Sequence, residues 1–340
     1  MNFSNVCGTA AMTVLIQLTA GLQSSLAADF LNDGMKSGTA EQYFASTPAG
    51  VSLESGRLIL PAGGTYSVAS LPFNAEEEKL YAVVFNARMK GPRAIETFPQ
   101  SRELFFLGEW SRGRAGAPLP VWALTFQDKD GKPVPGIRKN EFHTAILSSS
   151  MKEYRDEFIV PPGASRVVIT FRNNAPDTEL AVEGLKFLKV ENRAARNVNP
   201  DFSLGEWGFA GWTSGSGMRR LVPNPDEKGK YRLQLGEGGY VRSDAVFVKP
   251  GEHLRLEFKG RRTEGVKGGS RLIVFTYKNH LQRDDSQTGS LTRVFFLGDK
   301  VIEEKYSFVV PDDIAVLRVY NENGTLDYLR IVEDSPEKAE

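Results

Sequence analysis

Apolar and charged residues alternate one by one along several short stretches of the chain. In the stretch 254–259, leucine or phenylalanine stands at every second position, with arginine, glutamate or lysine between. The stretch 317–320 alternates in the same way. This period of two is typical of a β-strand with one buried face and one face toward solvent. Turn-forming clusters such as 128–133 separate such stretches, and no window shows a long helical period. The pattern predicts an all-β chain.

The predicted strands occur twice, in the same order. The segment 57–60, which two glycines follow shortly afterwards, matches 232–235. Phe-Ile-Val-Pro at 158–161 matches Phe-Val-Val-Pro at 308–311. The offset between matched positions shrinks along the chain, which places an insertion in the first half at about 89–120. An internal repeat of this kind indicates one structural unit used twice.

These matches divide the chain into two domains of similar construction. Each half is long enough to bury a core of its own. We expect each to be a β-sandwich of the jelly-roll type, because short alternating strands separated by turns favour that architecture. The expected boundaries are 28–190 for the first domain, 191–198 for a polar linker, 199–332 for the second domain and 333–340 for a charged tail.

The first residues have the character of an export signal. Residues 10–22 are apolar, and Ser25 and Ala27 supply small residues where a signal peptidase reads the chain. We predict a signal peptide at 1–27, although no Lys or Arg precedes the apolar run. The run is shorter than the roughly 20 apolar residues of a membrane span, and no later segment is apolar enough for one. The predicted location is therefore secreted or exported: periplasm, cell surface or medium.

Charge and cysteine content exclude several classes of function. Forty-two basic residues balance 42 acidic ones, which argues against nucleic acid as a partner. The only cysteine, Cys7, lies inside the predicted signal, so the mature chain would have no disulfide, thiolate site or cysteine nucleophile. The three histidines show no metal-ligand spacing. A catalytic reading, for example a lyase using His280 with Tyr277 and Arg283, is the least favoured.

The beginning and end of the second repeat carry a recognisable pattern. Asn-Pro-Asp-Phe at 199–202 precedes the pair Gly211-Trp212, and Leu-Asp-Tyr-Leu-Arg-Ile at 326–331 closes the repeat. This pattern resembles the carbohydrate-binding modules with a galactose-binding-like jelly-roll fold. The resemblance covers 199–332 well and 29–190 more faintly, because the first half lacks the Gly-Trp pair. It implies two aligned sheets, with a ligand on a concave face or at the loops of one edge.

The same resemblance implies a structural calcium near the first and last strands; no other cofactor is expected. Asp327 stands where the family tends to place a carboxylate, and Asp201 lies near the opening of the domain. Calcium binds several oxygen ligands at once. Ser203, however, stands where many relatives have an acidic residue. The alternative is that both carboxylates are solvated.

Cations gather on the predicted solvent side of the second domain. Arginine forks suit carboxylate or sulfate groups, and an aromatic ring can stack on a sugar. If the strands concerned are neighbours in one sheet, they form a basic groove for a polysaccharide with acidic groups. The alternative is an ordinary solvated face on which Glu257 pairs its neighbours. The candidate residues are Arg255, Lys259, Arg261, Lys278, Arg318 and Tyr320.

The insertion in the first half is rich in aromatic residues. Phe98 and Trp110 stand near several arginines and could stack on a sugar. The alternative is an extra hairpin that buries these rings. By contrast, Trp122 and Trp212 are expected in the two cores.

Three hypotheses remain. The first is a secreted, non-catalytic carbohydrate-binding protein. The second is a structural or adhesive cell-surface protein that associates with a protein partner or with itself through an exposed apolar insertion. The third is a polysaccharide-active enzyme, either a lyase or a hydrolase.

Overall fold

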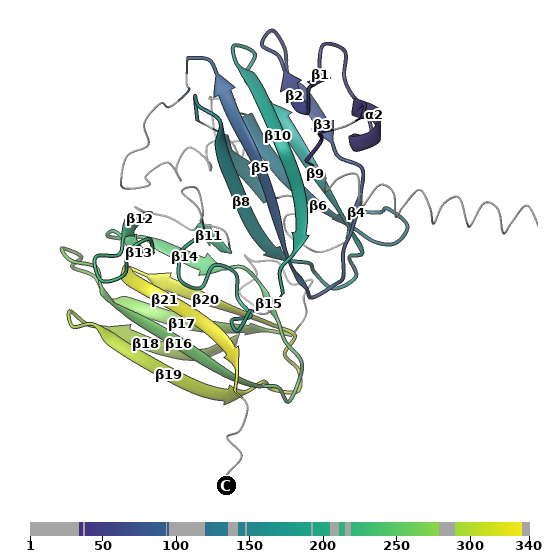
Figure 1. Cartoon of the computed structure of the whole chain (residues 1–340). Coiled ribbons are helices and arrows are strands. Elements are labelled where there is room, and N and C mark those ends of the chain that lie inside the picture. The colour runs from purple at the N-terminus through teal and green to yellow at the C-terminus, as the bar shows by residue number, and fades with distance from the viewer. Residues whose placement is uncertain are drawn as a thin grey trace, which may run out of the picture.

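The computed structural model describes residues 34–92 except 37, then 94, 120–134, 142–146, 148–204 except 192, 211–214, 219–278 and 290–334. Within these residues the chain is almost entirely β, with one short helix, α2 (Ala40–Tyr43). Figure 1 shows two separate stacks of strands, one formed by each half of the chain. The all-β, two-sandwich prediction is confirmed.

The first domain consists of two antiparallel sheets. One has the order β1-β2-β10-β5-β8, and the other has the order β3-β9-β6-β7 with β4 paired to β9. The strands are β1 (Ser52–Glu54), β2 (Arg57–Leu60), β3 (Tyr66–Ala69), β4 (Phe73–Asn74), β5 (Leu80–Lys90), β6 (Pro120–Gln127), β7 (Phe142–Ala145), β8 (Lys152–Ile159), β9 (Arg166–Asn173) and β10 (Glu179–Lys189).

The second domain repeats this topology. Its sheets have the orders β12-β13-β21-β16-β19 and β11-β14-β20-β17-β18, with β15 paired to β20. In the first domain β5 lies between β10 and the edge strand β8. In the second domain β16 lies in the same way between β21 and the edge strand β19, as the sequence repeat requires. The strands are β11 (Trp212–Ser214), β12 (Arg219–Pro223), β13 (Tyr231–Leu235), β14 (Tyr240–Ser243), β15 (Val246–Phe247), β16 (His253–Arg262), β17 (Ser270–Tyr277), β18 (Ser290–Leu297), β19 (Ile302–Val309), β20 (Val316–Glu322) and β21 (Gly324–Glu333).

Each sandwich encloses its own core. In the first domain Trp122 is 1% exposed and meets the ring of Phe85 edge to face, with 5.4 Å between ring centroids. In the second domain Trp212 is 4% exposed and lies 5.4 Å from Phe202. Burying each such side chain stabilises the fold by about 1.5–3 kcal/mol. Both tryptophans are core residues, as predicted.

Gly211, the glycine of the Gly-Trp pair, is required by close packing. Its φ is +77°, and a Cβ there would come within 2.7 Å of the carbonyl oxygen of Val198. A side chain is strained at such a φ, and here it would also meet backbone. The pair therefore packs the start of the second sandwich against the segment that enters it.

The segment predicted as a polar linker is bonded to the second domain. Ala195 forms a β-bridge with Val332. The side chain of Asn197, 2% exposed, donates to the carbonyl of Leu329 at 2.9 Å and accepts from the amide of Ile331 at 2.8 Å. Its amide group thus satisfies backbone groups of β21, and the segment lies along that strand.

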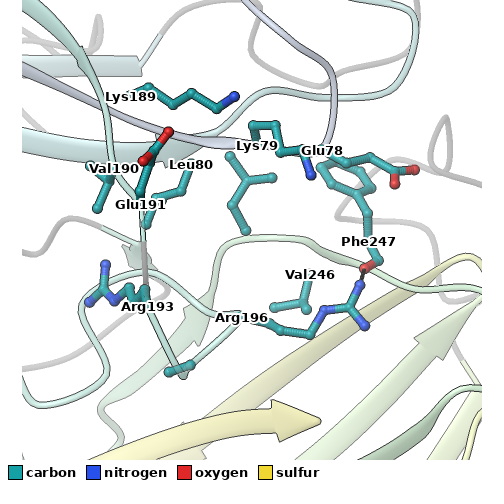
Figure 2. Close-up of a pocket in the computed structure, with 12 residues that line it drawn as sticks. Glu78, Lys79, Leu80, Lys189, Val190, Glu191, Arg193, Arg196, Val246 and Phe247 are labelled. Carbon is teal, nitrogen blue, oxygen red and sulfur yellow. Dashed lines mark hydrogen bonds between the residues drawn. The ribbon is translucent and has the colours of Figure 1, made fainter.

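Charged side chains connect the two domains across a cavity of about 340 Å³ (Figure 2). Arg196 donates to Glu252 at 2.7 Å and to the carbonyl of Phe247 at 2.8 Å. Arg193 donates to Glu157 of β8. Because these guanidinium groups bind carboxylates of both domains, they fasten the segment between the domains at each end.

Several predicted features lie outside the described residues. β5 ends at Lys90 and β6 begins at Pro120, so the insertion falls between two strands of opposite sheets. Phe98 and Trp110 themselves are outside the described part, as are the predicted signal peptide and residues 335–340. Among the helices that the structure describes, none is long and apolar enough to cross a membrane.

Candidate functional site

The structure separates the cations that the sequence grouped into one groove. Arg255 and Arg261, with Lys259 between them, lie on β16 in one sheet of the second domain. Arg318 and Tyr320 lie on β20 in the other sheet. The single groove expected from the sequence is therefore not formed, because alternation fixes which side of a strand is exposed but not which sheet the strand joins.

Two of the three predicted cations on β16, Arg255 and Lys259, already have carboxylate partners. Arg255 donates to Glu257 at 2.8 Å and to Asp334 at 2.5 Å, which is the pairing of the alternative interpretation. The ammonium of Lys259 lies 3.7 Å from the carboxylate of Asp327. Partly exposed pairs such as these contribute little to stability. They do, however, reduce the cations that this strand presents to a ligand.

The proposed calcium ligands do not fit a calcium site. Asp327 is 7% exposed, and its carboxylate lies 3.0 Å from the guanidinium of Arg232. Together with Lys259, this guanidinium supplies the positive charge that a metal ion would bring. Asp201 accepts a hydrogen bond from Ser203 at 2.7 Å. No group of three or more His, Cys, Asp or Glu residues able to hold a metal occurs within the described part of the chain.

The outer face of the other sheet presents a row of four side chains, one from each of four adjacent strands. Tyr240 of β14 pairs with Glu322 of β20, Glu322 with Arg271 of β17, and Arg271 with Phe296 of β18. Each has a buried neighbour along its strand, namely Val241, Asn321, Leu272 and Leu297, so these four side chains face away from the core. We call these four residues the aromatic row.

Exposed rings stand at the two ends of the aromatic row. Phe296 is 76% exposed and Tyr240 is 36% exposed. Three strand spacings of about 4.8 Å put the strands that carry them about 14 Å apart. An aromatic ring as exposed as that of Phe296 leaves a large apolar face in contact with water.

An ion pair lies between the two rings. The Nε and Nη2 atoms of Arg271 both donate to Oε2 of Glu322, at 2.9 and 2.5 Å. Among the described residues neither side chain has another hydrogen-bond partner. Oε1 of Glu322 can therefore still accept a hydrogen bond, and Nη1 of Arg271 can still donate one.

The predicted residues Arg318 and Tyr320 continue the same outer face. The hydroxyl of Tyr320 lies 3.1 Å from that of Tyr277, and its ring meets Phe275 edge to face at 4.6 Å. Arg318 donates to the carbonyl of Ser243 at 3.1 Å. Lys278, just after β17, forms a 2.6 Å ion pair with Asp313. The structure thus brings two of the six predicted groove residues, Arg318 and Tyr320, onto the same face as the aromatic row.

None of the four row residues was a candidate from the sequence. The signal was present in the two adjacent phenylalanines Phe295 and Phe296, because neighbouring residues of a strand point to opposite faces. Phe295 packs against the core of the second domain, which leaves Phe296 outside. The other three members needed the register between strands, which no local pattern supplies.

No protein-family model and no curated protein sequence matches the chain. Among solved structures, it is similar to the tandem domain CBM22-1–CBM22-2 of Paenibacillus barcinonensis Xyn10C, at 11% identity over 88% of this chain and 96% of that one, with a TM-score of 0.33. The xylan-binding CBM22-1 domain of the same protein matches at 16% identity over 40% of this chain and 94% of that one, with a TM-score of 0.30.

A second module of carbohydrate-binding family 16 matches at 18% identity, covering 38% of this chain and 94% of that one, with a TM-score of 0.30. These solved structures are tandem and single carbohydrate-binding modules, the class that the sequence resembles. With TM-scores below 0.5 and identities below 20%, this likeness supports no statement about function, so we derive function from the residues of this chain.

Proposed function

We propose that the chain is a carbohydrate-binding protein that holds a polysaccharide along the aromatic row. The observation that carries the proposal is the 76% exposure of Phe296. Phe296 lies in the same row as a second exposed ring and as an ion pair in which each partner can still form a hydrogen bond to a ligand. A soluble protein gains nothing in folding from a ring left in water. A ligand that covers the ring removes this apolar area from solvent.

The row matches the two surfaces of a sugar. The C–H face of a pyranose is apolar and stacks on Tyr240 or Phe296, while its rim of hydroxyl groups needs donors and acceptors in one plane. Arg271 and Glu322 offer both, and their mutual ion pair holds them in place before the ligand arrives. A charged partner also makes each hydrogen bond to a hydroxyl stronger than one between neutral groups.

The charge of this face supports a ligand with acidic groups. Arg271 and Arg318 lie on this face, on β17 and β20, whereas Arg242 of β14 is 9% exposed. Arginine forks pair with carboxylate and sulfate groups. A uronic or sulfated polysaccharide is therefore the proposed ligand. The predicted export signal would place the protein where such polymers occur.

A binding role is favoured over cleavage. Hydrolysis of a glycosidic bond ordinarily requires two carboxyl groups that flank the bond. The aromatic row supplies one carboxylate, that of Glu322, and it is ion-paired to Arg271. The adhesive alternative uses the same exposed rings, because they would equally bury apolar area against a protein.

The test is retention of the full chain on immobilised neutral, uronic and sulfated polysaccharides, with each polymer then checked for cleavage. We expect selective retention on an acidic polymer, its loss in Phe296→Ala, and intact polymer afterwards. Val309→Ala is the matched control, because Val309 is a 51% exposed apolar residue on β19 of the opposite sheet. If the chain is retained on none of the polymers, the result would favour the adhesive role. If a polymer is shortened, the result would favour an enzyme.

A further inference from the structure

A second, smaller cavity lies on the opposite sheet of the second domain. Its volume is about 220 Å³. It opens beside the three adjacent strands β13, β21 and β16, so the two sheets of the sandwich separate it from the aromatic row. Its lining residues are Pro225, Asp226, Arg232, Gly260, Arg261, Val301, Thr325 and Asp327.

One arginine of this cavity is fixed by carboxylate and amide partners. Arg232, whose side chain is 14% exposed, lies 3.0 Å from Asp327 through Nε. Its Nη2 donates to Asn224 at 2.9 Å and to Asp226 at 3.3 Å. These partners hold the guanidinium in one orientation, so a ligand would not have to order it.

A β-bulge produces this arrangement. Lys259 pairs with Tyr328, whereas the next residue of β16, Gly260, pairs with Leu326, so Asp327 has no partner across the ladder. A bulge of this kind changes the direction in which a side chain points. Here the carboxylate of Asp327 lies between Arg232 and Lys259.

The second arginine of the cavity, Arg261, has no hydrogen-bond or ion-pair partner in the part of the chain that the structure describes. Arg261 pairs with Thr325 in the register, and the hydroxyl of Thr325 is engaged by Thr263 at 2.9 Å. Among the described residues nothing forms a hydrogen bond or ion pair with the guanidinium of Arg261. The matching residue of the first repeat, Arg88, has the carboxylate of Glu179 at 4.0 Å. Within the described residues, the second repeat thus leaves Arg261 without the carboxylate partner that Arg88 has in the first repeat.

The charges that line the cavity balance, two arginines against two aspartates, and the adjacent Lys259 adds one positive charge. Arg232, Arg261 and the adjacent Lys259 face the carboxylates of Asp226 and Asp327. Arginine presents paired N–H groups in one plane, a geometry that matches the oxygens of a carboxylate or sulfate. A single small oxyanion would supply the partner that Arg261 lacks.

We propose that this cavity binds a small oxyanion, a carboxylate or a sulfate group, through the guanidinium of Arg261. The site does not depend on the aromatic row, since the two lie on opposite sheets. A uronic acid residue and a sulfate ester share the required chemistry, and the experiment separates them.

The test is a calorimetric titration of the full chain with sodium sulfate and, separately, with glucuronate, with glucose as the uncharged counterpart. The titrations are made at low ionic strength, because salt screens exposed charges. We expect saturable binding of at least one anion and none of glucose. Arg261→Gln should weaken that binding about tenfold to a hundredfold, since it removes hydrogen bonds from a charged donor. Binding of sulfate would indicate a sulfate ester as the group recognised, and binding of glucuronate would indicate a uronic acid residue.

Arg262→Gln is the matched control. It removes the same charge one residue away, from a side chain bonded to Asp299 at 2.9 Å that does not line the cavity. It should leave the binding of either anion unchanged, as should Phe296→Ala. Absence of saturable binding in the wild type, or equal losses in Arg261→Gln and Arg262→Gln, would overturn the proposal. An unchanged thermal midpoint in Arg261→Gln would exclude misfolding as the cause of its loss.

Discussion

The junction between the two domains should weaken as the pH rises, because of one carboxylate pair. Asp156 of β8 retains only part of its surface in contact with solvent. Loss of hydration, together with the negative charge of Asp244 in the second domain, raises the pKa of Asp156 to about 8. Glu157 adds to the effect, although its backbone N–H donates to Asp156 at 2.9 Å and opposes it. Asp156 is therefore protonated in the folded chain at neutral pH.

The sign of the effect follows from proton linkage. In the unfolded chain Asp156 has an ordinary pKa of about 4. Between about pH 4 and pH 8 the folded state holds one proton more than the unfolded state, so the free energy of unfolding falls as the pH rises. The slope is about 1.4 kcal/mol per pH unit, and the total is at most on the order of 5 kcal/mol. This contribution is complete below pH 4 and lost above pH 8.

The perturbation is Asp156→Asn, which keeps the shape of the side chain and cannot ionise. We expect the variant and the wild type to have similar midpoints in scanning calorimetry near pH 4, and the variant to be more stable above pH 8. Direct titration of the carboxyl carbon by NMR should show the raised pKa. Parallel curves for the two proteins from pH 4 to pH 9 would refute the reasoning.

Three further predictions follow from named contacts. Affinity for oligosaccharides of increasing length, measured by calorimetry, should rise until one sugar chain reaches both Tyr240 and Phe296. Replacing either ring by alanine should weaken binding by about 1.5 kcal/mol, or about tenfold in Kd, because about 60 Å² of ring is no longer covered by the ligand. Asp327→Asn should lower the free energy of unfolding in urea by about 1–3 kcal/mol, because it removes the buried carboxylate 3.0 Å from Nε of Arg232 and leaves that guanidinium with Asn224 and Asp226 alone; an unchanged midpoint would contradict this. Gly211→Ala should destabilise by a similar about 1–3 kcal/mol, since it combines a positive φ with a backbone clash, and a fully stable variant would show that the entry segment can move.

The sequence predicted the architecture because the strands of each sandwich are marked by local alternation of apolar and polar residues. Alternation at 254–259 gives β16 with Leu254, Leu256 and Phe258 all buried. The repeat then transfers the same topology to the first half, and both sheets of each domain have matching orders. Register and alternation are strong signals here because one face of every strand lies against a core.

The composition of the candidate site was only partly predictable. Consecutive strands of this fold can enter opposite sheets, as β16 and β17 do, so residues close in sequence can end on opposite sides of the domain. Tyr320 and Arg318 were found because they alternate with core residues. Tyr240 and Phe296 were missed because their partners are defined only by the pairing of β14 with β20 and of β17 with β18.

The segment 191–198 shows the limit of composition as a guide. Its polar residues are typical of a flexible connection. In the structure, however, the side chains of Arg196 and Asn197 form hydrogen bonds with a carboxylate and with backbone groups of the second domain. In the sequence, a polar side chain that hydrogen-bonds to water looks the same as one that hydrogen-bonds to protein. The two cases are distinguished only by where the acceptors lie in the folded chain.

Polysaccharide binding along the aromatic row can be tested by backbone NMR of the isotopically labelled full chain, titrated with fragments of the polysaccharide that retains it best. We expect the largest shifts on Tyr240, Arg271, Phe296 and Glu322, with small changes on β16 and in the first domain. Saturable shifts confined to the first domain, or no shifts with any acidic or neutral fragment, would contradict this expectation.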